Sequence, residues 1–146
     1  MTTWTAEFYE DSHGKRPVEK WMHGLGDDEF AALRAGIVRV LEPRGLGLAG
    51  TAWLKALGDG LYEFRLRHDA ATIDALYTDS GASSAASSTR ILLRVFVHFH
   101  GQKVILILHG YDKGRDDSPR RQNKEIQEAR KRLRSWKAAE VAKRKR

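Results

Sequence analysis

Residues 61–67 read Leu-Tyr-Glu-Phe-Arg-Leu-Arg, and residues 93–100 read Leu-Arg-Val-Phe-Val-His-Phe-His. Side chains alternate between the two faces of a β-strand, so each stretch predicts a strand with one apolar and one polar face. The polar faces carry Glu63, Arg65, Arg67, Arg94 and His98. We expect a half-buried sheet that exposes a row of guanidinium and imidazole groups to water, a surface suited to an anion such as an RNA phosphate.

A third strand follows at once. Residues 104–113 read Val-Ile-Leu-Ile-Leu-His-Gly-Tyr-Asp-Lys, and a tight connection at residues 100–102 joins this stretch to the previous one. The apolar run at residues 104–108 is typical of a central strand covered on both faces.

Helical patterns flank these strands. Apolar residues at helical spacing predict one helix that begins at Pro17 and a second that begins near Asp27 and ends around residues 43–45. A last helix begins at Pro119, and its end at residues 143–146 is expected to fray. Alternation in residues 2–10 predicts a first strand, and residues 46–59 are interpreted as a connection. The predicted order is β-α-α-β-β-β-α, an α+β domain with a mostly antiparallel sheet.

One domain is predicted over residues 1–136, with a basic C-terminal tail at 137–146. Residues 69–89 are interpreted as a flexible insertion because residues 80–89 are rich in Ser and Ala. Within this segment, Ile73, Leu76 and Tyr77 either extend the preceding strand or form a short element of their own.

The composition excludes several classes of protein. The chain of 146 residues has no cysteine, which excludes disulfides, thiolate zinc sites and cysteine nucleophiles. No apolar run reaches the roughly 20 residues that span a bilayer. The first residues lack the features of a signal peptide. These observations predict a cytoplasmic protein that does not associate with a membrane.

The positive charge lies at one end of the chain. Residues 113–146 carry 14 of the 26 Lys and Arg but 5 of the 19 Asp and Glu, a net charge of +9, whereas residues 1–112 have a net charge of −2. Clustered positive charge favours association with a polyanion, so contact with nucleic acid or the ribosome is expected. The alternative is a solvated helix whose charges keep it soluble.

Several motifs together resemble the phage-derived HigB-like toxins of the RelE/ParE superfamily. They occur in the expected order over about residues 5–136: 8–11 (Phe-Tyr-Glu-Asp), 14–21 (Gly-Lys-Arg-Pro-Val-Glu-Lys-Trp), 55–65, 94–99, 108–113, and the Ser118-Pro119 turn before 125–129. Residues 69–89 depart from the pattern, because the family usually has a short hairpin there.

The resemblance implies a RelE/ParE-like fold and the toxin component of a type II toxin–antitoxin system. It implies a ribosome-dependent mRNA endoribonuclease (an mRNA interferase), neutralised by a helix-turn-helix antitoxin of the HigA-like type. Two alternatives remain open: a ParE-like toxin that poisons gyrase without nuclease activity, and a non-catalytic basic nucleic-acid-binding module.

The candidate catalytic residues are Arg65, Arg94, Lys113 and His98. Planar guanidinium groups match phosphate oxygens, and histidine titrates near neutrality and can act as a general acid or base. The resemblance places phosphate-stabilising basic groups at Arg65 and Arg94. For both arginines the alternative is a structural ion pair with a carboxylate such as Glu63.

The candidate RNA-binding residues are Lys55, Arg67, Tyr111 and Arg115, of which Tyr111 is expected to stack on a base. The alternatives are a solvated residue at Lys55, Lys113 and Arg115, and a hydrophobic plug at Tyr111. Metal-free attack by the RNA 2′-hydroxyl is expected, because the spacing of His and carboxylate residues indicates no metal site and no cofactor motif occurs.

Overall fold

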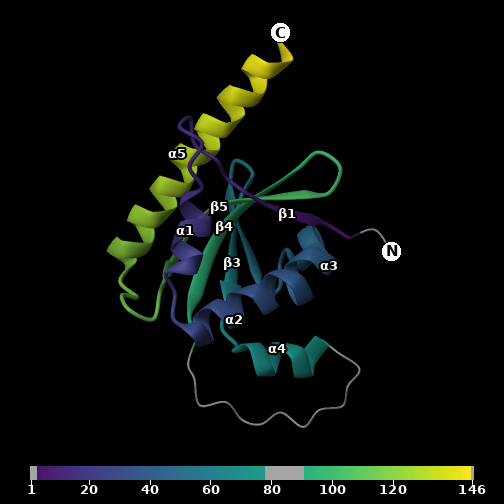
Figure 1. Ribbon diagram of the computed structural model, residues 1–146, viewed down its shortest axis with the longest axis vertical. Coiled ribbons are helices and arrows are strands. Elements are labelled where there is room, and N and C mark those ends of the chain that lie inside the picture. Colours follow the sequence, from purple (N-terminus) through teal and green to yellow (C-terminus); the bar gives the residue numbers. More distant parts are fainter. Residues whose placement is uncertain (1–2, 78–90, 146) are drawn as a thin grey trace.

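The computed structural model describes residues 3–77 and 91–145, and it arranges them as an α+β fold with helices on both faces of a mixed sheet (Figure 1). Within these residues the sheet has five strands in the order β1-β5-β4-β3-β2. The strands are β1 (Thr5–Phe8), β2 (Leu54–Gly58), β3 (Leu61–Leu66), β4 (Leu93–His100) and β5 (Val104–Asp112). Among these five strands, β1 and β5 alone pair in parallel, so the prediction of a mostly antiparallel sheet is confirmed.

The helices are α1 (Pro17–His23), α2 (Asp27–Ala35), α3 (Glu42–Arg44), α4 (Ala70–Tyr77) and α5 (Pro119–Arg144). A π-helical segment, Gly36–Leu41, continues α2 into α3, and a 3₁₀ turn, Gly45–Leu48, follows. Gly36 explains how closely this helix approaches the sheet, because a Cβ there would lie 2.8 Å from Leu66 Cδ1. Helix α2 begins with acidic residues, whose negative charges interact favourably with the positive end of the helix dipole.

Two hydrophobic cores lie on opposite faces of the sheet. The helices α1 and α2 cover one face, which contributes Phe64, Leu66, Val95 and Ile105. Helix α5 covers the other face, where Ala129 and Leu133 pack with a second set of apolar residues: Leu61, Phe96, Leu106, Leu108 and Tyr111. Both faces of β5 are therefore buried, as the apolar run at 104–108 predicts.

The prediction that the polar strand face opens to water is wrong at Glu63 and Arg94. Glu63 and Arg94 are 0% and 4% exposed, because α5 lies over this face. The apolar stripe of α5 needs a partner surface, and Phe96 together with Leu106, Leu108 and Tyr111 of β5 supplies one. Burial of that stripe encloses the charged residues between the strands and the helix.

The sequence pattern does not predict strand β2 and instead indicates a connection over residues 46–59. The strand pairs antiparallel with β3 at the edge of the sheet, and its register shifts between Ala56 and Gly58. Leu54 is its one fully buried side chain, so the pattern of a half-buried strand is weak. A left-handed turn at Asp59 and Gly60, with φ of 57° and 83°, then leads into β3.

The segment 69–89 is described only in part. Its first residues form helix α4, which answers the open question about Ile73: this side chain is fully buried in the core under α2. The Ser/Ala-rich stretch lies outside the described residues.

Helix α5 continues without a break past Trp136 to Arg144, so the expected domain boundary falls inside a helix. The fraying expected over residues 143–146 does not occur at Lys143 and Arg144, which are helical, and Arg146 lies outside the described residues. Alanines at 138, 139 and 142 favour helix, and Lys143 Nζ lies 3.4 Å from Glu140 Oε1. In the described part of the chain, no helix is both long enough and apolar enough to cross a membrane.

Candidate functional site

Strand register brings several predicted site residues into one row. Arg65 of β3 pairs with Arg94 of β4, and Arg94 pairs in turn with Tyr111 of β5. Paired residues on neighbouring strands project from the same face of a sheet. The row therefore crosses three strands on the face that α5 covers, and we call Arg65, Arg94 and Tyr111 the arginine row.

A buried carboxylate organises this row. Glu63 Oε1 accepts a hydrogen bond from Arg65 Nε at 2.9 Å and lies 4.0 Å from Arg94 Nε. Its other oxygen accepts from Gln122 Nε2 of α5 at 3.1 Å. A buried carboxylate needs such partners, since desolvation of an isolated charge is costly. Glu63 thus holds both arginines and the first turns of α5 in place.

Arg94 lies beneath the surface, where a phosphate cannot reach it easily. Its side chain is 5% exposed, and one guanidinium nitrogen donates to the Leu93 carbonyl at 3.5 Å. Burial lowers the pKa of Arg94, and Glu63 opposes that shift. The pairing of Arg94 with Glu63 matches the structural alternative considered for this arginine.

Arg65 is placed differently, because its side chain is 23% exposed while it remains bonded to Glu63. Arg67 is exposed just beyond the end of β3. Lys55 is also exposed and pairs with Glu63 in the register of β2 with β3, so it borders the arginine row from the edge strand. These three cations can meet a ligand from solvent.

Lys113 extends the site past the end of β5. Burial lowers the pKa of its ammonium group, and the nearby positive charge of Arg94 lowers it further. Arg65 and Arg67 act in the same direction, whereas Glu63 alone among the named groups opposes them. Arg65 and Arg94 pair with Glu63, and the charges of Arg65, Arg67, Arg94 and Glu63 all act on Lys113, so four cations share the neighbourhood of this carboxylate. This excess of positive charge favours the binding of an anion.

Tyr111 is not available to stack on a base. It is 1% exposed, its ring packs parallel to Phe96 with centroids 6.1 Å apart, and the Arg121 guanidinium lies 5.3 Å from its ring centre. Burial raises the pKa of Tyr111 to about 12, so its hydroxyl stays protonated at neutral pH. The prediction of an RNA-stacking tyrosine is therefore wrong, because α5 covers the ring.

His98 shares the face of the arginine row but lies elsewhere on it. It is four residues from Arg94 along β4, which corresponds to roughly 13 Å. Its Nδ1 lies 2.7 Å from the Gly60 carbonyl oxygen, and its ring contacts Trp136. Burial lowers its pKa. The structure does not bring His98 to the candidate catalytic residues.

Helix α5 contributes residues that sequence reasoning missed. Gln122 reaches Glu63, and Arg121 covers Tyr111 while its Nε lies 3.6 Å from Glu125 Oε2. The Ser118 hydroxyl caps the helix by accepting from the Arg121 backbone at 3.1 Å. The Ser-Pro pair at 118–119 indicates where this helix begins, but it carries no information about which strand the first turn contacts.

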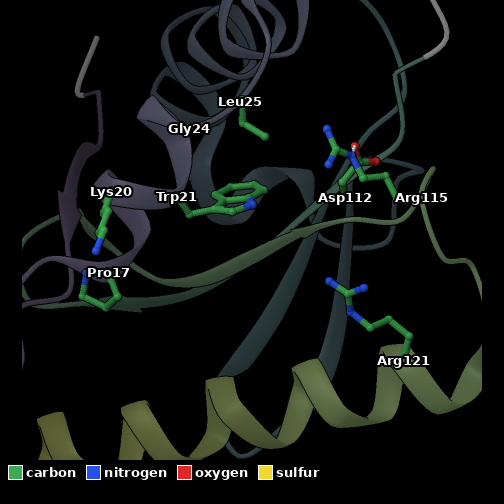
Figure 2. Close-up of a pocket in the computed structure, with 8 residues that line it drawn as sticks. All are labelled: Pro17, Lys20, Trp21, Gly24, Leu25, Asp112, Arg115 and Arg121. Carbon is green, nitrogen blue, oxygen red and sulfur yellow. Dashed lines mark ion pairs between the residues drawn. The ribbon is translucent and has the colours of Figure 1, made fainter.

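Arg115 lies apart from the arginine row. Its side chain is 74% exposed, and its Nε lies 3.3 Å from Asp112 Oδ2. It lines a pocket of about 500 Å³ between α1, the end of β5 and the beginning of α5, together with Trp21 and Arg121 (Figure 2). A neighbouring hollow of about 480 Å³ shares Asp112 and Arg115 and includes Lys113.

The described residues contain no group of three or more His, Cys, Asp or Glu arranged to hold a metal ion. Comparison with known proteins found no protein-family model that matches the chain and no curated protein of significantly similar sequence.

Proposed function

We propose that this protein is the toxin of a type II toxin–antitoxin pair, a HigB-like member of the RelE/ParE superfamily that cleaves mRNA on the ribosome. The observation that carries the proposal is the excess positive charge around Glu63, with Arg65 and Lys113 at its open edge. An α+β fold whose C-terminal helix packs on the sheet is compatible with it. The assignment to this toxin family, and the expectation of a helix-turn-helix antitoxin, rest on the resemblance of the sequence motifs.

The chemistry suited to such a site is cleavage by the RNA itself. The 2′-hydroxyl oxygen bonds to the adjacent phosphorus, its proton passes to water, and the bond from phosphorus to the 5′-oxygen breaks. The products are a 2′,3′-cyclic phosphate and a 5′-hydroxyl. Negative charge grows on the phosphate oxygens in the transition state, so fixed guanidinium groups accelerate the reaction.

Each basic residue has a distinct role in this proposal. Arg65 and Arg67 bind the phosphate oxygens. Lys55, on the edge strand β2, attracts the RNA backbone toward this site. Lys113 gives a proton to the departing 5′-oxygen, a role favoured by its lowered pKa. Arg94 is a positioning residue, since it lies buried behind Arg65 and shares Glu63 with it.

The test is primer extension on an mRNA after the protein is induced without an antitoxin. Wild type is compared with Arg65→Ala, Lys113→Ala and Arg34→Ala. Arg34 is an exposed arginine of α2, so its variant matches the loss of charge away from the site. We expect discrete cuts inside translated codons for wild type and Arg34→Ala, and a loss of about 10²- to 10³-fold for Arg65→Ala.

Circular dichroism and thermal unfolding of the same variants separate loss of chemistry from loss of folding. Growth arrest with intact mRNA would reject the nuclease hypothesis and favour a toxin that acts on gyrase. The absence of growth arrest would favour a non-catalytic basic binding module.

A further inference from the structure

The pocket beside α1 has a rigid aromatic wall. A Cβ at Gly110 would lie 2.4 Å from Cζ3 of Trp21, so the indole lies directly against the backbone of β5. Trp21 is nevertheless partly exposed, and it packs on the apolar core at the rim of the pocket. Figure 2 shows the indole at the centre of the lining residues, with Leu25 beside it. The glycine thus allows a flat ring to be held firmly next to solvent.

The remaining walls carry mostly positive charge. Lys20 of α1, Arg115 and Arg121 line the pocket, and Asp112 is the acid among its lining residues. Asp112 forms an ion pair with Arg115, and Arg121 is 35% exposed beside its partner Glu125. In Figure 2 the guanidinium of Arg121 extends from α5 toward the space below Trp21. An anion in the pocket can therefore contact the cation of α1 on one side and Arg115 or Arg121 on the other.

The pocket is also connected to the proposed cleavage site. Arg121 lies over Tyr111, which ends the arginine row, and Arg115 lines the adjoining hollow with Lys113. The turn after β5 therefore lies between the pocket and Lys113, and the carboxylates Glu29, Asp112 and Asp117 also line the adjoining hollow. The volume of the pocket, about 500 Å³, lies within the usual range for small-ligand sites.

We propose that this pocket binds one nucleotide of single-stranded RNA, with its base against Trp21 and its phosphate on Arg115 and Arg121. Aromatic rings and guanidinium groups are the usual partners of unpaired bases and phosphates. An acidic peptide suits the cations but makes no specific use of a flat indole fixed against a glycine. The placement of this nucleotide beside the scissile phosphate rests on the proposed function; nucleotide binding itself does not.

The test is ¹⁹F NMR of the full chain labelled with 5-fluorotryptophan. The four tryptophans give four resonances, and Trp21→Phe assigns the one of interest. The probe is a 2′-O-methyl hexaribonucleotide, which lacks the attacking hydroxyl and cannot be cleaved by the proposed chemistry. We expect its addition to shift the Trp21 resonance and to leave that of Trp53, which packs on Phe64, unchanged.

A substitution at the exposed Arg115 tests binding without disturbing the core, on which Trp21 packs. Arg115→Ala should weaken binding of the hexanucleotide about tenfold, whereas Arg34→Ala should change it little. Polyglutamate of matched charge serves as the competing probe.

Three outcomes would overturn the inference: RNA binding that leaves the Trp21 resonance in place, a Trp21 shift with polyglutamate but not with RNA, or no RNA binding at all. A Trp21 shift with RNA in a protein that leaves mRNA uncut would uphold the nucleotide site and reject the nuclease.

Discussion

The two faces of the sheet are buried by different means. Under α1 and α2 the contacts are apolar, with Phe64, Leu66 and Val95 at their centre. Under α5 the apolar residues share the interface with Glu63 and Arg94, both nearly inaccessible to solvent. Buried ion pairs seldom stabilise a fold more than apolar residues of similar size. The comparison therefore teaches that the charges under α5 are better explained by the exposed cations they position than by stability.

The largest effect is expected on the charged face, at Glu63. Glu63→Ala leaves Arg94 buried without its carboxylate, and we expect a loss of about 3–5 kcal/mol in the free energy of unfolding. Urea denaturation followed by circular dichroism measures this loss.

The matched control replaces the pair. Glu63→Leu combined with Arg94→Met should recover stability to near wild type, because apolar residues of similar volume fill the same space. If the double variant is as unstable as Glu63→Ala, the charges themselves hold the two layers together, and the contrast between the faces disappears.

The next effect is expected on the apolar face, at Gly110. Gly110→Ala introduces a Cβ into the Trp21 ring, so the indole or β5 must move, at a cost of about 1–3 kcal/mol. The same substitution should abolish the Trp21 shift on addition of RNA.

Thermal unfolding compares it with Gly47→Ala, where a Cβ would meet nothing within 4 Å. Equal stability of the two variants would show that Trp21 is not held against β5.

The smallest effect concerns an acid at the rim of the apolar face. Burial, followed by the neighbouring Asp112, raises the pKa of Glu29 above its ordinary value of 4.5. The folded state therefore binds this proton more tightly than the unfolded state. The associated stability is complete below pH 4.5 and is lost as the pH rises through the raised pKa.

Glu29→Gln should remove this loss, so its advantage over wild type should grow between pH 4.5 and pH 8. Urea denaturation at several pH values measures it, with Glu140→Gln near the far end of α5 as the control. A constant difference between Glu29→Gln and wild type across this range would contradict the assignment.

Local patterns predicted most of the strands and helices because their signals lie within a few residues. Alternation around Arg65 and Arg94 identified β3 and β4, and the apolar run identified β5. Local patterns did not predict β2, because an edge strand with one fully buried side chain shows little alternation between apolar and polar residues. Helix α4 has eight residues, too few for periodicity to distinguish a helix from a short strand.

The sequence by itself determined that Arg65, Arg94 and Lys113 belong to strands or their ends, and that α5 has an apolar stripe. Only the tertiary structure decided which of them meet solvent. The strand register aligned Arg94 with Arg65 and Tyr111, and α5 then covered Arg94 and Tyr111. Periodicity indicates that a helix has an apolar side but not which surface that side covers, because that choice depends on contacts between residues far apart in the chain.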